Sequence, residues 1–287
     1  MKSSRAAPRL SSGQARPGRA RLRVFEPHAH MYARTTNDYE AMARAGIEVV
    51  VEPAFWLGET RRHAGSFFDY FSHLTHYENS RAAKYGIKQF VTLAMNPKEA
   101  NDRALADAVI AELPRFLDHE RVVAVGEIGF DRISAEEEDA MVRQIELARQ
   151  AGLPILIHSP HVNKPEGIRK NLDIVKRLRF PMERTLMDHN TEETTGMTLE
   201  AGAWAGHTVY PITKLSPERM ANIIGDHGWD RMMVNSAADW GPSDPLMVPH
   251  TIEELRHRGE NEKNIRKLVW DNPVAFFSQS GRLKGIG

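Results

Sequence analysis

Residues 122–158 read VVAVGEIGFDRISAEEEDAMVRQIELARQAGLPILIH, and this stretch has the pattern of a strand, a helix and a second strand. Both ends are apolar, β-branched runs of strand length, whereas the middle, Ala135 to Ala151, has helical periodicity. Ser134 and Glu137 form a capping box before the helix, and Gly152 stands where a C-terminal cap glycine belongs. A unit of this kind predicts two parallel strands joined by a right-handed crossover.

The same alternation of strand-like and helical segments extends over residues 22–287. Helical periodicity recurs over Glu99–Leu117 and Glu262–Leu268, and a short helix is expected through Phe277. Eight such units predict an α/β fold, a closed (β/α)8 TIM barrel in a single domain. An open doubly wound sheet is the alternative, but no Gly-rich phosphate loop follows the first strand. The eight strand-like runs are Leu22–Phe25, Ile47–Glu52, Ile87–Ala94, Val122–Glu127, Pro154–His158, Thr185–Asp188, His207–Tyr210 and Met232–Asn235.

Composition narrows the class of protein. Of 287 residues, 41% are hydrophobic and 26% charged, which is ordinary for a globular protein and unlike a fibrous or wholly disordered one. Cysteine is absent, which excludes disulfides, thiolate metal sites and cysteine nucleophiles. No run of 18 apolar residues is present, so we expect no membrane span.

The N-terminal residues 1–21 are rich in Arg, Ser, Pro and Gly, and we interpret them as a disordered basic leader. An organelle transit peptide, a misassigned start and an expression artefact fit the same composition, and otherwise we expect a cytoplasmic protein. Residues 1–23 hold seven basic residues and no acidic one, so the remainder carries 31 basic against 38 acidic residues. This acidic body counts against a large nucleic-acid surface.

A long connection, residues 53–85, follows the second predicted strand and is rich in aromatic residues. In a barrel it would lie on the face that carries catalytic residues. We expect it to be an insertion that acts as a lid or as a packing surface.

Polar side chains stand where several predicted strands end. His28 and His30 are two residues apart and therefore share one face of the first strand. Glu127 closes the apolar fourth strand, where a carboxylate is unfavourable unless it is paired or binds a metal. Because the strand ends of a barrel converge on one rim, the set predicts a metal site of nitrogen and oxygen ligands. The remaining members of the set are His158, His189 and Asp239.

The order H-x-H, G-E-x-G-x-D, H, H, D along eight units resembles the TatD-type metal-dependent hydrolases of the amidohydrolase superfamily, over residues 22–280. The most specific piece is Gly126 to Asp131. The resemblance implies two divalent ions, zinc first, with manganese, magnesium or iron as alternatives, and a metal-activated water. It implies that His28, His30 and Asp239 hold one ion, that His158 and His189 hold the other, and that Glu127 bridges them. Asp239 would also orient the water and accept its proton.

The sequence departs from the family pattern at positions that face substrate. Glu26 stands where the family has Asp, and Ser159-Pro160-His161 follows the fifth-strand histidine in place of Thr-Arg. Residues 190–193 and 237–238 also differ from the usual motifs. We therefore expect a divergent branch that hydrolyses a small phosphoester or a small cyclic ester or amide.

Several further residues are candidates for roles around this site. His63, His161, Lys164 and Trp240 are the candidate substrate contacts, and Asp131 and Asn190 would orient metal ligands. A 3′-end DNA exonuclease is the first alternative function, so nucleic acid is a less favoured substrate. A metal-binding scaffold without turnover and a one-metal lyase are the others. The sequence does not indicate an oligomeric state.

Overall fold

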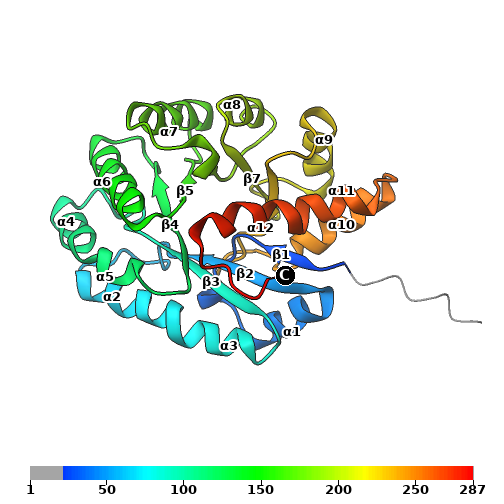
Figure 1. Ribbon diagram of the computed structural model, residues 1–287, viewed down its shortest axis with the longest axis horizontal. Coiled ribbons are helices and arrows are strands. Elements are labelled where there is room, and N and C mark those ends of the chain that lie inside the picture. The colour runs from blue at the N-terminus through cyan, green and yellow to red at the C-terminus, as the bar shows by residue number, and fades with distance from the viewer. Residues whose placement is uncertain (1–21, 287) are drawn as a thin grey trace, which may run out of the picture.

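The computed structural model describes residues 22–286, and the predicted basic leader lies outside them. Eight parallel strands follow one another in chain order around a single curled sheet, and helices cover its outside (Figure 1). This is the (β/α)8 TIM barrel that the alternation predicts. The strands are β1 (Val24–Glu26), β2 (Ile47–Pro53), β3 (Lys88–Leu93), β4 (Val122–Gly129), β5 (Ile155–His158), β6 (Thr185–Met187), β7 (Trp204–Thr208) and β8 (Met232–Asn235).

Twelve α-helices lie in the described part of the chain, together with shorter helical turns. Two of these turns, η2 and η4, are π-helical. The α-helices are α1 (Thr36–Ala45), α2 (Ala64–Ser72), α3 (Asn79–Ala83), α4 (Arg103–Glu112), α5 (Pro114–Leu117), α6 (Ala135–Ala151), α7 (Lys164–Arg177), α8 (Thr195–Glu200), α9 (Pro217–His227), α10 (Met247–His257), α11 (Glu262–Arg266) and α12 (Asn272–Phe277). The turns are η1 (Met31–Ala33), η2 (His73–Glu78), η3 (Met182–Arg184), η4 (Lys267–Asp271) and η5 (Ser278–Ser280).

Helix α6 has the bounds that the sequence predicts. The Ser134 hydroxyl accepts from the Glu137 amide, the Glu137 carboxylate reaches back to the Ser134 amide, and Gly152 ends the helix at a φ of 65°. The Glu137 carboxylate also accepts from the Arg132 and Ile133 amides, so it stabilises the turn that follows β4. One capping residue thus fixes both the helix and the loop beside the end of a central strand.

Two expected elements differ from the structure by three or more residues at one end, whereas the other expected bounds differ by at most two. The helix expected from Glu99 begins only at Arg103, because the buried Glu99 carboxylate pairs with Arg61 and accepts from the Asn96 side chain in the preceding loop. The seventh strand runs over Trp204–Thr208 rather than His207–Tyr210. Ala205 and Gly206 in this strand are too small to give a strong strand pattern. Gly206 must be small because a Cβ there would lie 2.4 Å from the Asp188 carboxylate.

The aromatic-rich connection after β2 is mostly packed helix. It forms α2, η2 and α3, and Phe67, Phe71 and Leu74 are fully buried against the barrel. Only its first part, with Phe55 and Trp56, reaches the rim described below. The segment was expected to act as a lid or as a packing surface, and most of it is a packing surface.

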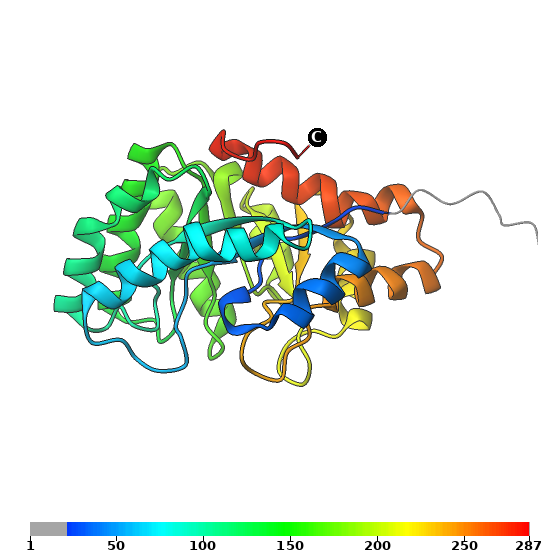
Figure 2. The same cartoon turned by 90° about the horizontal axis from the view of Figure 1, so that it is seen from below.

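The two ends of the barrel are built differently. At one end, Trp270 of η4 and Phe276 and Phe277 of α12 pack against side chains that fill the barrel interior. Figure 2 shows α12 and the C-terminal chain along one edge of the molecule, opposite the long connecting loops. At the other end, the His30 amide donates to the Ala238 carbonyl and the Ala237 amide to the His28 carbonyl. Among residues 22–286 no ladder joins β1 to β8, so these loop hydrogen bonds bring the two strands together at the rim.

In the described residues, no helix is long and apolar enough to cross a membrane.

Candidate metal centre

Five side chains from four strand ends meet at the rim where the β-strands terminate. Glu127 lies near the end of β4, His158 ends β5, and His28, His30 and His189 directly follow β1 and β6. All five are nearly fully buried. Gly129 permits this convergence, because its φ is +118° and a Cβ there would lie 2.5 Å from the His158 carbonyl oxygen.

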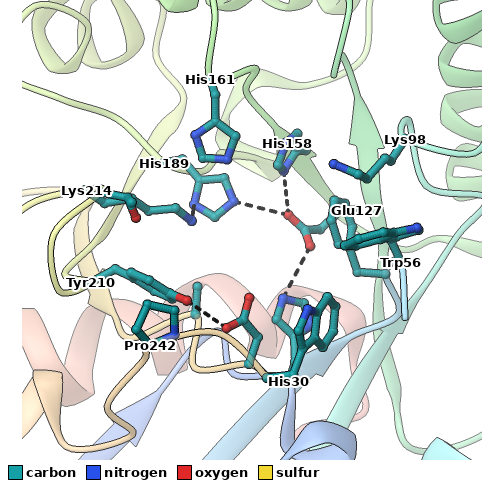
Figure 3. Close-up of a pocket in the computed structure, with 15 residues that line it drawn as sticks. His30, Trp56, Lys98, Glu127, His158, His161, His189, Tyr210, Lys214 and Pro242 are labelled. Atoms are coloured by element: carbon teal, nitrogen blue, oxygen red, sulfur yellow. Dashed lines mark hydrogen bonds and ion pairs between the residues drawn. The ribbon is translucent and has the colours of Figure 1, made fainter. Parts of the chain in front are cut away.

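The Glu127 carboxylate stands between His30 on one side and His158 and His189 on the other (Figure 3). Its Oε1 lies 3.5 Å from His28 Nε2 and 3.9 Å from His30 Nε2. Its Oε2 lies 3.0 Å from His158 Nδ1 and 3.4 Å from His189 Nε2. Each carboxylate oxygen therefore faces its own pair of imidazoles.

The other ring nitrogens of the first pair are held by groups that only accept hydrogen bonds. His28 Nδ1 lies 2.5 Å from Asp188 Oδ2, and His30 Nδ1 lies 3.2 Å from the Pro53 carbonyl oxygen. Both Nδ1 atoms therefore carry the proton, and in the neutral form that binds metal both Nε2 atoms present lone pairs. These two Nε2 atoms are only 3.1 Å apart. Two facing lone pairs repel each other unless a cation lies between them, so the pair fits a metal ion.

The second pair has a similar character. His189 Nδ1 lies 2.5 Å from the Thr208 hydroxyl, so its Nε2 faces Glu127. Within the described residues, His158 Nε2 and Glu127 Oε1 are buried and have no hydrogen-bonding partner. Buried polar atoms are almost always satisfied, so these two orphans indicate ligand positions. His28, Glu127 and His189 also offer ligand atoms that lie within 4.8 Å of one another.

The electrostatics favour neutral His30 and His189 beside a charged Glu127. Burial, followed by the neighbouring cations His28 for His30 and Lys214 for His189, lowers the pKa of both rings, to about 4 for His30. At His28 burial lowers the pKa, but Glu127 and Asp188 outweigh it and raise the pKa above its ordinary value. Burial opposes ionisation of Glu127, but His28 and His158 hold its pKa well below the usual range. Neutral histidine and ionised carboxylate are the forms that bind metal.

Asp239 lies at the same rim but is held by other partners. Its Oδ1 accepts from the Tyr210 hydroxyl at 2.9 Å and from the Gly241 amide at 2.8 Å. Among the described residues, no ion pair joins Asp239 to the four histidines, although it lines the same cavity as His30. The structure thus gathers five of the six expected ligands closely and places the sixth at the cavity wall.

A cavity of about 230 Å³ opens above these groups. Phe55, Trp56 and Trp240 form an aromatic wall, and Trp240 is 42% exposed. His161 and Lys214 lie on the wall beside His189, as Figure 3 shows. The cavity lining is His30, Phe55, Trp56, Lys98, Glu127, His158, His161, His189, Tyr210, Thr213, Lys214, Ala237, Asp239, Trp240 and Pro242.

The remaining expected residues lie in different places. Lys164 lines a smaller cavity that adjoins the first. His63 is exposed at the start of α2 and does not line either cavity, because α2 packs outside the barrel. Asn190 was expected to orient a metal ligand. Its side-chain amide instead donates to the Met187 carbonyl and accepts from the Thr198 hydroxyl, so it holds the chain after β6 in place. Asp131 pairs at 3.9 Å with Arg132.

Three residues with evident roles were not singled out from the sequence. Asp188 holds His28, Tyr210 holds Asp239, and Lys214 Nζ lies 3.4 Å from His189 Nδ1. Asp188 could have been found, because it stands immediately before a strand-end histidine in the same buried run. Tyr210 and Lys214 lie in the loop after β7, where no periodic pattern indicates which side chains turn inward.

A parallel barrel with histidines and a carboxylate at the C-terminal rim of its strands defines a class of metal-dependent hydrolases. Comparison with known proteins specifies the family. The family model described as TatD-related DNase matches residues 26–278. The chain therefore belongs to the TatD family and is a metal-dependent hydrolase.

Individual relatives agree with this assignment. An uncharacterized metal-dependent hydrolase of Methanocaldococcus jannaschii is 27% identical over 254 residues, which span 88% of this chain and 99% of that protein. An uncharacterized metal-dependent hydrolase of Mycobacterium tuberculosis is 36% identical over 190 residues, 63% of this chain and 65% of that one. The crystal structure of a TatD-like protein from Archaeoglobus fulgidus superposes with a TM-score of 0.73 at 27% identity, covering 88% of this chain and 99% of that chain.

Proposed function

We propose that this hydrolase holds two divalent metal ions and uses them on a small phosphoester or a small cyclic ester or amide. The observation that carries the proposal is the Glu127 carboxylate, whose two oxygens face separate histidine pairs. His28 and His30 would hold one ion together with Asp239, and His158 and His189 would hold the other, with Glu127 shared. Zinc suits four imidazoles and two carboxylates, and manganese, magnesium and iron are the alternatives.

Bound divalent ions would polarise the substrate and lower the pKa of a water molecule. The residues of the chain supply the rest. Asp188 and the Pro53 carbonyl fix the tautomers of His28 and His30, so both rings present Nε2 to the centre. The Tyr210 hydroxyl and the Gly241 amide hold Oδ1 of Asp239, which leaves Oδ2 as the group to accept the proton of the attacking water.

The size and shape of the cavity support a small substrate. About 230 Å³ accommodates a compact molecule, and the aromatic side chains restrict water on one wall. The Trp56 and Trp240 rings pack edge to face, with centroids 5.5 Å apart, and Lys98 Nζ lies 4.7 Å from the centroid of the Trp56 ring, so Trp56 is part of a packed wall. That arrangement favours a small molecule over a strand of stacked bases.

The test is turnover by the zinc- or manganese-loaded protein on four probes: a phosphomonoester, a phosphodiester, a five-membered lactone and single-stranded DNA. We expect hydrolysis of at least one small ester, and a loss of roughly 10²- to 10⁴-fold in kcat for Asp239→Asn. The matched control is Asp244→Asn. Asp244 lies in the same loop as Asp239, but its carboxylate pairs with His250. Trimming of DNA alone would establish the exonuclease instead. A protein with full metal content that hydrolyses none of the four probes would favour the metal-binding scaffold without turnover.

A further inference from the structure

A second cavity of about 120 Å³ adjoins the metal centre on the side of His189. It shares His161, His189, Thr213 and Lys214 with the larger cavity, so a ligand can extend from one into the other. Its other lining residues include Lys164 of α7 and Arg219 of α9. The feature that distinguishes this cavity is its positive charge.

Two of its three cations lack a carboxylate partner in the described part of the chain. Arg219 is fully engaged, because its Nε and Nη2 bind the two oxygens of Glu192 at 2.8 and 2.7 Å. Among residues 22–286, the hydrogen-bond contacts of Lys164 Nζ are the carbonyl and hydroxyl oxygens of Ser159, at 3.5 and 3.3 Å. Lys214 Nζ contacts the Nδ1 atom of His189. Neither lysine therefore has a negatively charged acceptor for its N–H donors among the described residues.

This arrangement is electrostatically unfavourable without an anion. Burial and then Lys214, which lines the same cavity, lower the pKa of Lys164 to about 8. Burial and then Lys214 likewise lower the pKa of His161 to about 4. A charge that is removed from water is stabilised chiefly by an opposite charge that accepts its hydrogen bonds.

The opposite wall of the metal cavity has a different character. Figure 3 shows Lys214 and His161 on one side of Glu127 and Trp56 and Lys98 on the other. Lys98 Nζ lies 4.7 Å from the centroid of the Trp56 ring, so this third lysine has an aromatic partner. The candidate metal centre thus lies between a wall built around Trp56 and a wall that carries Lys214. A ligand that contacts both walls would have an anionic end beside Lys214.

We propose that Lys164 and Lys214 form an anion subsite, and that the substrate carries a phosphate or carboxylate group apart from the bond that is hydrolysed. The proposal rests on the proposed function and specifies its substrate class. The anionic group would lie in the 120 Å³ cavity, within reach of both ammonium groups, while the scissile ester or amide lies over Glu127. Neutral esters would then be poor substrates.

The experiment is a calorimetric titration of the purified full-length protein with inorganic phosphate and, separately, with succinate. It compares wild type, Lys164→Met, Lys214→Met and the matched control Lys98→Met, which removes the same charge from the opposite wall. We expect Kd for the preferred anion to rise by about tenfold or more in the first two variants and by less than about twofold in the control. Lys164→Arg, which keeps the charge, should recover most of the affinity.

Equal affinities in all four proteins, or an equal loss in Lys98→Met, would overturn the subsite. Tighter binding of phosphate would assign a phosphate group, and tighter binding of succinate a carboxylate. The titration is repeated after treatment with a chelator, and the ratio between wild type and Lys164→Met should persist. A protein without metal would contradict the proposed function while leaving this ratio intact, so the two failures are distinguishable.

Discussion

Asp188 is not a candidate ligand, but it holds two of the candidate ligands, His28 and His189, in place. Its Oδ2 holds His28 Nδ1, and its Oδ1 accepts from the His189 amide and the Asn235 side chain. Burial opposes its ionisation, but His189 and His28 hold its pKa below the usual range. Asp188 therefore keeps its charge and fixes the tautomer of one ring and the backbone of another.

Replacing Asp188 with Asn should weaken metal binding. The amide cannot anchor the protonated Nδ1 of His28 as a carboxylate does, so we expect affinity for zinc to fall about 10- to 100-fold. Competition with a chromophoric chelator measures this. Asp173→Asn, on the exposed face of α7, removes the same charge and should leave the affinity unchanged. Unaltered affinity in Asp188→Asn would mean that the carboxylate does not support the ligands.

At the scale of elements, the register of β4 against β5 brings the two halves of the centre together. Gly129 pairs with His158 across the two strands, and its φ of +118° lies where residues with a Cβ rarely go. The close approach of the His158 carbonyl leaves no space for a side chain. The glycine is therefore required by the position of the histidine.

We expect Gly129→Ala to lower the free energy of unfolding by roughly 2 kcal/mol or more, because the alanine is both strained and in collision with backbone. Urea denaturation measures the change. The matched control is Gly225→Ala, at an exposed position of α9 where a Cβ would meet no other atom within 4 Å. There about 0.5–1 kcal/mol of stabilisation is expected. A Gly129→Ala protein as stable as wild type would show that the strand register can relax.

The elements also show which parts of the site can be predicted from sequence. His28, His30, Glu127, His158 and His189 lie at or beside strand ends, where hydrophobic periodicity locates them and barrel topology places them on one rim. The loops after β7 and β8 carry no such pattern. Tyr210 and Lys214 enter the cavity because of loop conformation, and His63 stays outside it because α2 packs against the barrel wall. The sequence alone does not indicate which side chains of these segments point into the cavity.

At the scale of the whole molecule, the barrel contains a second group of buried carboxylates beside β2. Glu52 accepts from the Tyr32 amide and from Gln89, whereas Glu78 of η2 is paired with Arg81 at 2.6 Å. Burial raises the pKa of both carboxyls, Glu78 raises that of Glu52 further, and the pKa of Glu78 is about 7. This group is structural and should make overall stability depend on pH.

The sign follows from the raised pKa of Glu78. Between its ordinary value of 4.5 and about 7, the folded protein binds more protons than the unfolded chain, so the free energy of unfolding falls as pH rises. We expect Glu78→Gln to remove roughly 2 kcal/mol of that fall, as urea denaturation at about pH 4.5 and about pH 7.5 would measure. Glu166→Gln on exposed α7 is the control. Parallel pH profiles for wild type and Glu78→Gln would contradict the assignment.

The account depends most directly on Glu127 as the group shared by two metal ions. The decisive measurement is the metal content of the purified protein by plasma mass spectrometry, for wild type beside Glu127→Ala, after incubation of each with zinc or manganese. We predict about two equivalents in wild type and one or none in the variant, because each carboxylate oxygen faces its own histidine pair. Wild-type protein that binds no metal under these conditions, or a variant that retains both ions, would contradict it.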